Sequence, residues 1–146
     1  MLAVPEQSFD HVAGLLTAYS VALDKGELEI AGDYLDQALE RHLYYPALFR
    51  SSLLLEGAYF EAYVRQQANI ARAWFDKIEE TALTSPYALL RAESAVLLAE
   101  GKLAEAQSKA EKGLESAQRD RFMIGSAITE IERLQTLLHN ISAAST

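Results

Sequence analysis

The sequence predicts an all-α fold: about three helical hairpins closed by a C-terminal capping helix, seven helices in a single domain over residues 1–146. Two observations lead to this prediction. Apolar residues recur at three- and four-residue steps through most of the chain, which is the spacing of amphipathic helices. Turn residues interrupt these apolar stripes so that they fall into pairs, and each pair predicts two helices joined by a short turn.

The clearest hairpin covers residues 85–116. Ser85 can accept a hydrogen bond from the free amides of a first helical turn, and Pro86 suits the first helical position because its missing N–H would be unpaired there. Gly101 interrupts a run rich in Ala, Leu, Glu and Lys, which marks the turn. Two short helices with one apolar side each cannot bury both stripes alone, so this hairpin must pack against neighbours.

The first hairpin, residues 8–41, repeats this pattern. Aligning Ala31 with Ala106 also aligns Gly26 with Gly101, together with several leucines of the two stripes. This agreement predicts the same helix–turn–helix unit at both places.

The middle hairpin, residues 46–80, is a looser copy that turns at residues 65–67 and has Ala71 at the matching position. The last helix is predicted over residues 121–141 as a closing element, with Glu130, Glu132 and Arg133 on its wet face. Residues 142–146 are predicted to be a frayed tail.

The charge balance excludes one class of partner. The chain has 13 basic and 21 acidic side chains and a net charge of −8, so its surface would repel the phosphate backbone of a nucleic acid. It has no cysteine, which excludes disulfides and thiolate metal sites and fits a reducing compartment.

No apolar run approaches the roughly 18–20 residues that span a bilayer, so no direct membrane insertion of this segment is expected. Residues 1–10 lack the basic start of a signal peptide and are interrupted by Pro5 and Glu6. The sequence therefore predicts a soluble, cytoplasmic protein.

No pattern for catalysis, metal or cofactor binding was found. His11, His42 and His139 lie far apart, and none has a ligand partner at three- or four-residue spacing. Adjacent carboxylates such as Glu79 and Glu80 do not face each other on a helix. No glycine-rich phosphate loop is present, and carboxylate pairs formed by folding stay possible. We therefore expect no enzyme activity, no metal and no cofactor.

The small residues Ala31, Ala71 and Ala106, each preceded by a turn five positions earlier, resemble the tetratricopeptide repeat. The resemblance covers most of the chain and implies a right-handed superhelix of hairpins. It also places Glu93 on the packed side of its helix. Either the register slips there, or Glu93 is paired, with Arg72 as the candidate partner.

A narrower resemblance involves LEGAYFEAYVRQQ, ARAWFDKI and LLRAESAVLLAEGKLAEA. These segments are similar to the soluble helical tail of bacterial site-2-protease-like intramembrane metalloproteases. The His-Glu-x-x-His motif of that family is absent here, so no protease activity carries over. This resemblance implies a regulatory or oligomerising domain of a larger, membrane-embedded zinc metalloprotease.

The tetratricopeptide-like packing implies an inner groove lined by the first helix of each hairpin. Phe60 and Tyr63 offer aromatic surface of the kind enriched at binding hot spots, and Arg91 could pair with a carboxylate of a peptide. Alternatively, Phe60 and Tyr63 fill ordinary core, as is expected for Trp74. The candidate partner-binding residues are Leu16, Leu23, Leu53, Glu56, Phe60, Tyr63, Arg91 and Leu98.

The leading interpretation is a non-catalytic scaffold that binds a protein or peptide in this groove. The alternatives are the protease-associated domain and a self-associating structural protein. Self-association would use the Ile- and Leu-rich C-terminal helix to form a homo-oligomer.

Overall fold

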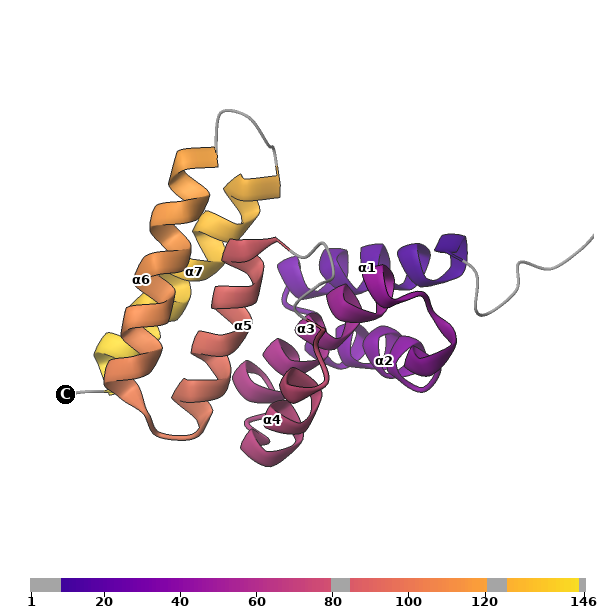
Figure 1. The fold of residues 1–146 in the computed structure, drawn as a ribbon, viewed down its shortest axis with the longest axis horizontal. Coiled ribbons are helices and arrows are strands. Elements are labelled where there is room, and N and C mark those ends of the chain that lie inside the picture. The colour runs from indigo at the N-terminus through magenta and orange to yellow at the C-terminus, as the bar shows by residue number, and fades with distance from the viewer. Residues whose placement is uncertain (1–8, 80–84, 121–125, 145–146) are drawn as a thin grey trace, which may run out of the picture.

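The computed structural model describes residues 9–79, 85–120 and 126–144, and these residues contain helices and turns with no strand. The all-α class is therefore confirmed (Figure 1). The elements are α1 (Phe9–Asp24), α2 (Leu28–Leu39), the 3₁₀ helix η1 (His42–Tyr44), α3 (Ala47–Tyr63), α4 (Ala68–Asp76), α5 (Pro86–Ala99), α6 (Leu103–Asp120) and α7 (Ser126–Ala144).

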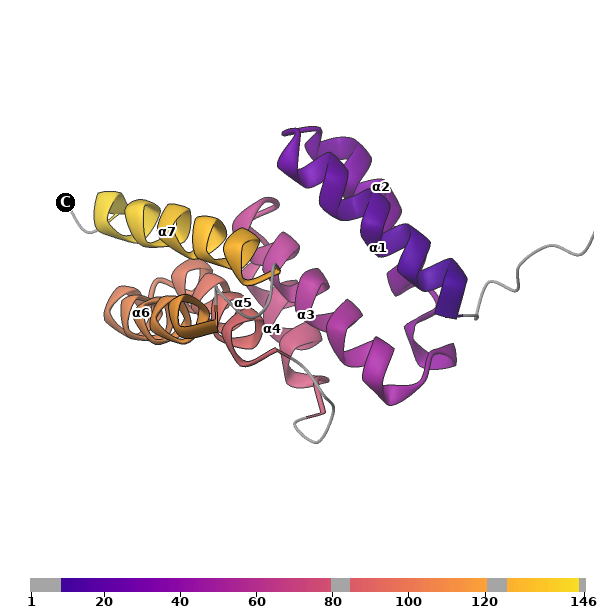
Figure 2. The same cartoon turned by 90° about the horizontal axis from the view of Figure 1, so that it is seen from above.

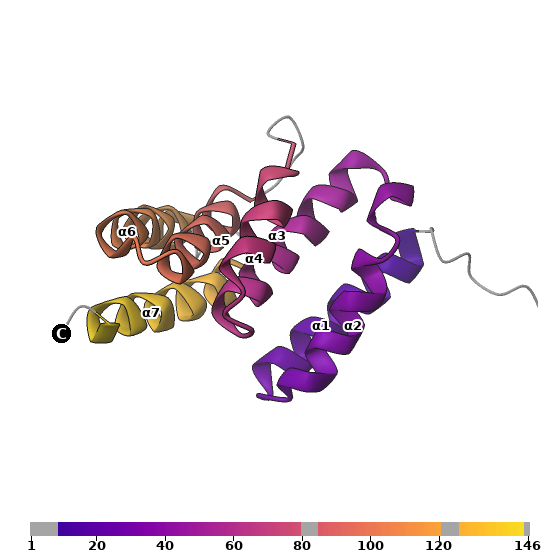
Figure 3. The ribbon, with the colours of Figure 1, turned by 90° about the horizontal axis from the view of Figure 1, so that it is seen from below.

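The helices pack in antiparallel pairs. α1 packs on α2, α3 on α4 and α5 on α6, while α3 also packs along α5, and α7 packs on α6 and α5. The third pair and α7 run across the direction of the first pair (Figure 1). α1 and α7 lie on the same side of α3, which can be followed from above and from below (Figures 2 and 3). This arrangement brings the C-terminal end of α1 close to the N-terminal half of α7, where Asp24 lies 3.4 Å from Arg133.

The turns of the first and third pairs have the same geometry. Gly26 and Gly101 adopt positive φ angles of 77° and 80°. The residue after each glycine donates its amide to a carbonyl five positions back, at 2.9 Å in both turns. Glycine suits this left-handed helix ending because it has no Cβ to clash. The middle turn uses Gln66 at a φ of 57°.

Small residues let the helices approach closely. Ala31, Ala71 and Ala106 are each 0% exposed, as their pattern in the sequence predicts. A Cβ added at Gly57 or Gly113 would come within 3.1 Å of a leucine side chain of a neighbouring helix. Larger residues at these five positions would push the helices apart.

The helix ends match the sequence prediction in part. The Ser85 hydroxyl accepts a bond from the Ala88 amide at 3.4 Å, which confirms this cap. α6 continues to Asp120, beyond the predicted end at residue 116. The last helix begins at Ser126 and includes residues 142–144, which were predicted to fray. Residues 121–125, predicted to open that helix, lie outside the described part.

The described residues form three core clusters. One lies between the first pair and α3, the second between α3, α4 and α5, and the third among α5, α6 and α7. Their largest apolar members include Tyr19, Leu35 and Phe60, then Leu55, Tyr59 and Val96, then Leu134, Leu137 and Ile141. Within the described ranges, no helix is both long and apolar enough to cross a membrane.

Candidate functional site

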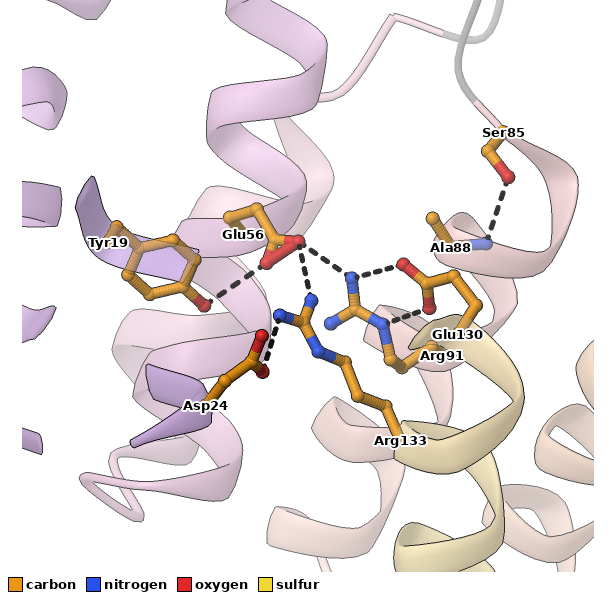
Figure 4. A network of polar contacts seen from close by, with 8 residues as sticks. All are labelled: Tyr19, Asp24, Glu56, Ser85, Ala88, Arg91, Glu130 and Arg133. Atoms are coloured by element: carbon orange, nitrogen blue, oxygen red, sulfur yellow. Dashed lines mark hydrogen bonds and ion pairs between the residues drawn. The ribbon is translucent and has the colours of Figure 1, made fainter. Parts of the chain in front are cut away.

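The candidate site begins with a buried arginine at the junction of α3, α5 and α7. Arg91 is 0% exposed. Its Nε donates to Glu130 Oε2 at 2.6 Å, and its Nη2 donates to Glu130 Oε1 at 3.1 Å and to Glu56 Oε1 at 2.7 Å (Figure 4). One guanidinium from α5 is thus held by carboxylates from two other helices, which offsets the cost of burying its charge.

A second arginine extends this network to α1. Arg133 Nη1 lies 3.7 Å from Glu56 Oε1, and Arg133 Nη2 lies 3.4 Å from Asp24 Oδ1. Tyr19 donates its hydroxyl to Glu56 Oε2 at 3.1 Å. Figure 4 shows Glu56 between Tyr19 and the two guanidinium groups. Glu56 therefore joins side chains from α1, α5 and α7.

The two central groups of the network, Glu56 and Arg91, are charged near neutral pH. Burial alone would raise the pKa of Glu56, but the charges of Arg91 and Arg133 and the bonds from Arg91 and Tyr19 hold this pKa below its usual value. Burial alone would lower the pKa of Arg91, but Glu56 and Glu130 hold this pKa well above its usual value. Neither shift moves a pKa towards neutrality, where a general acid or base works best.

The tyrosines around the network stay protonated. Burial raises the pKa of Tyr19 well above its usual value, and the Glu56 charge adds to this effect. Burial likewise raises the pKa of Tyr59 to about 12. The Arg91 Cζ lies 4.2 Å from the centroid of the Tyr59 ring, a cation–π contact. Both phenols are therefore neutral neighbours of the ion pairs: Tyr19 donates a hydrogen bond to Glu56, and Tyr59 offers its ring face to Arg91.

A cleft lies beside this network, between α1 and α7, with α3 as its floor. We call it the α1/α7 cleft, and its volume is about 520 Å³. It is lined by Leu23, Asp24, Leu28, Tyr59, Tyr63, Val64, Glu132, Arg133 and Thr136. The Asp24–Arg133 pair therefore forms part of its wall.

A smaller hollow of about 240 Å³ lies on the other side of the network. Tyr19 and Glu56 are among its lining residues, with Leu16, Ser52, Leu55 and others. The ion pairs thus stand between two cavities. They divide the surface that the sequence predicted as one groove.

The candidate residues from the sequence are distributed over several places. Leu23 and Tyr63 line the α1/α7 cleft, and Leu16 and Glu56 line the smaller hollow. Leu98 borders a separate cavity together with Tyr63. Tyr63 also accepts a hydrogen bond from the Asn140 amide of α7. These five residues therefore do not line one continuous groove.

The other three candidates are core residues. Leu53, Phe60 and Arg91 are 0%, 1% and 0% exposed. Phe60 packs edge-to-face on Tyr19 with ring centroids 5.9 Å apart. Phe60 also borders a hollow of about 360 Å³ together with Leu28 and Val64. At these exposures the three side chains offer almost no surface to a partner.

The solvent-exposed face predicted for the last helix is wrong for two of its three residues. Glu130 and Arg133 were expected to face water, but their side chains are each only 12% exposed and join the network. Glu132 is exposed as expected. The signal was present in the sequence, because Glu130 lies at helical spacing with the buried Leu134 and Leu137. Ile128 of the same helix is 53% exposed.

The predicted Glu93–Arg72 pair is wrong. Glu93 pairs with Lys109 at 3.4 Å, and Arg72 pairs with Glu100 at 2.7 Å. Trp74 is half-buried against the first two core clusters, in keeping with the structural role expected for it. Of the two alternatives that the sequence left open, Glu93 is paired, but with Lys109 of α6 instead of Arg72.

Comparisons with protein-family models, with curated proteins and with solved structures found no match for this chain. In the part of the chain that the structure describes, no group of three or more His, Asp or Glu side chains could hold a metal ion.

Proposed function

We propose that this protein is a non-catalytic interaction module that binds a segment of a protein or peptide in the α1/α7 cleft. The cleft carries the proposal. Its volume of about 520 Å³ lies within the range of about 300–1,000 Å³ typical of ligand sites. Tyr63 is half-buried at its floor and stacks on the buried Tyr59 with centroids 5.4 Å apart, and tyrosine is enriched at binding hot spots.

The contacts around the cleft favour a prepared site with one adjustable wall. Arg91 and Glu130 are buried and the Glu56 side chain is only 16% exposed, and together they fix α5, α7 and α3 relative to one another. In contrast, the Asp24 side chain is 60% exposed, and its 3.4 Å contact with Arg133 is long. Such surface pairs contribute about 0–1 kcal/mol, so a partner can replace this one at little cost to the fold.

We further propose that the helix pairs form a tetratricopeptide-like right-handed superhelix. The antiparallel pairing, the buried alanines and the position of α1 and α3 beside the cleft support this arrangement. A cytoplasmic location is part of the same proposal and rests on the acidic, cysteine-free composition.

Self-association through the C-terminal helix ranks lower. The apolar stripe of α7 is buried within its own chain, at Leu134, Leu137 and Ile141. It is therefore not exposed for packing against a second copy. The protease-associated domain stays a prediction of the sequence resemblance.

The test is a selection of binding peptides from a random displayed library, followed by measurement of their affinity for three forms of the protein. Thr136→Trp fills the cleft from an exposed position on α7. Ile70→Trp is the control, because Ile70 is 47% exposed on α4 and does not line the cleft. Phe60→Ala is unsuitable, because opening the core there costs about 3–5 kcal/mol.

We expect selected peptides to lose at least tenfold in affinity for Thr136→Trp and to bind Ile70→Trp as they bind the unchanged protein. Peptides that bind both variants equally well would remove the cleft from the proposal. So would a library that yields no binder at all.

A further inference from the structure

We propose that the partner in the α1/α7 cleft is an amphipathic helix with an apolar stripe flanked by Lys or Arg. This inference deepens the proposed function and rests on it. Three features of the surface around the cleft lead to it: unpaired carboxylates at the rim, arginines that are already neutralised, and the length of the apolar floor.

The rim of the cleft carries carboxylates without cationic partners. Glu132 of α7 lines the cleft, and Glu29 and Asp33 of α2 line the hollow next to it. All three side chains are exposed. Among the residues that the structure describes, none of the three forms an ion pair. Three negative charges without an ion pair therefore lie along the apolar floor, against one exposed lysine, Lys25 of the α1–α2 turn.

The two arginines near the cleft do not cancel this charge. Arg133 already faces Asp24 at 3.4 Å and Glu56 at 3.7 Å. Arg65 already donates to Asp36 at 2.9 Å and to Glu61 at 2.6 Å. Each cation is thus shared between two carboxylates of the protein itself. The potential that a partner meets at the rim is therefore negative and attracts basic side chains.

The apolar floor is longer than the cleft itself. Leu28 and Val64 line both the α1/α7 cleft and the neighbouring hollow of about 360 Å³. The two form a strip from Thr136 on α7, past Tyr63, to Leu28 on α2. An amphipathic helix places apolar side chains along such a strip at positions i, i+3, i+4 and i+7. Its flanking basic residues would then reach Glu132 at one end and Glu29 and Asp33 at the other.

The same charges disfavour other occupants. An anionic membrane surface or a nucleic acid would meet the carboxylates of the rim and be repelled. A second copy of this chain carries the same net charge of −8 and the same rim. A basic helix of another protein satisfies both the apolar floor and the acidic rim.

The experiment uses two synthetic peptides of roughly 18 residues, long enough to form a helix. Both carry leucines at helical spacing, and the remaining positions are lysine in one peptide and glutamate in the other. Calorimetry at low and high salt gives the affinities, and amide chemical shifts of the protein locate the site. We expect the lysine peptide to bind at least tenfold more tightly, with shifts at Leu28, Tyr63 and Thr136, and to weaken as salt rises.

Two charge variants isolate the rim. Glu29→Lys with Asp33→Lys reverses two rim charges, one of them in the first turn of α2. Glu105→Lys with Glu115→Lys changes the net charge equally on the exposed surface of α6, and Glu105 is likewise in a first turn. We expect the rim variant to bind the lysine peptide about tenfold more weakly and the α6 variant to bind it within about twofold of the unchanged protein.

The outcomes separate this inference from the proposed function. Equal weakening by the two charge variants, shifts outside the cleft, or preference for the glutamate peptide would each overturn the basic helix as partner. Failure of both synthetic peptides, while library peptides bind and are blocked by Thr136→Trp, would overturn it too and leave the cleft as a binding site. If Thr136→Trp blocks no binding, the proposed function fails together with it.

Discussion

The two sides of α3 are built differently. Towards α5, small apolar residues interlock: Leu55, Ala58 and Ala62 of α3 pack with Ala92, Ala95 and Val96 of α5. The contact between α3 and α1 is much less extensive. It depends on large and polar groups, namely the Tyr19–Phe60 ring contact and the Tyr19–Glu56 hydrogen bond. The α5 side is therefore rigid by close packing, whereas the α1 side depends on a few groups and forms the adjustable wall of the cleft.

Arg91→Ala should have the largest effect, because Arg91 stands where both sides of α3 meet. Its removal leaves Glu130 and Glu56 without their closest cation, and breaking a buried ion pair in this way costs about 3–5 kcal/mol. Urea denaturation measures this loss of unfolding free energy. Arg91→Met with Glu130→Met, which removes the charge of both partners, should be more stable than Arg91→Ala. A loss below about 1 kcal/mol in Arg91→Ala would mean that the network does not hold the junction.

Ala58→Leu should break the close-packed side of α3. Ala58 is 0% exposed between α3 and α5, so the added side chain has no room and should cost about 1–3 kcal/mol. Ala73→Leu is the matched control, because Ala73 is exposed on α4. We expect the control to unfold within about 0.5 kcal/mol of the unchanged protein in the same urea titration. If the two variants behave alike, close packing does not distinguish this side of α3.

Acid should loosen the α1 side first. The pKa of Glu56 is lowered in the fold, so its contribution to stability is full above the ordinary glutamate value of 4.5 and is lost as the pH falls through the lowered pKa. Protonation would weaken its bonds with Tyr19, Arg91 and Arg133. Hydrogen exchange measured at decreasing pH should then show the amides of α1 and α2 opening before those of α5 and α6.

Glu56→Gln is the control for this pH dependence. It should weaken the contact between α1 and α3 at neutral pH. As the pH falls, the amides of α1 and α2 should then no longer open well before those of α5 and α6. Glu100, whose pKa is lowered chiefly by its bond from Arg72, keeps a smaller acid effect near α4 in both proteins. If hydrogen exchange rises equally in all helices, protonation of Glu56 does not cause α1 to detach from α3.

The turn between α3 and α4 should give the smallest effect. Gln66 adopts a φ of 57° at the place where the other two hairpins have glycine. A left-handed conformation costs a non-glycine residue about 1–2 kcal/mol, so glycine at this position removes that cost. Glycine also has more conformational freedom in the unfolded chain, which lowers the stability of the folded state and offsets part of the benefit. Gln66→Gly should therefore raise the unfolding free energy by at most about 1 kcal/mol. Gly101→Ala should lower it by about 1–2 kcal/mol. Thermal unfolding of the two variants measures both changes. A stabilising Gly101→Ala would contradict this account.

The helices and turns could be predicted because their signals are local. The Ser85 cap, the glycines at 26 and 101 and the buried alanines all act within a few residues or within one apolar stripe. The apolar side of α7 was predicted from its isoleucines and leucines, and Leu134, Leu137 and Ile141 are indeed buried. Packing on α5 and α6 also buries Glu130, which the sequence had placed on the wet face.

The candidate site could be predicted much less well. Arg91 lies 35 residues from Glu56 and 39 from Glu130, and Asp24 lies 109 residues from Arg133. Each charge looks like part of a solvated helix face when its own helix is considered alone. Phe60 and Tyr63 looked alike in the sequence, yet one is core and the other lines the cleft, because they point to different neighbours of α3.

The sequence by itself determined the all-helical class, the pairing of neighbouring helices and the positions where small residues are required, since hydrophobic spacing and turn chemistry are properties of short segments. Only the tertiary structure decided which charges are buried together and which aromatic rings face the cleft. These depend on the angles at which the helix pairs cross, and packing over the whole chain sets those angles.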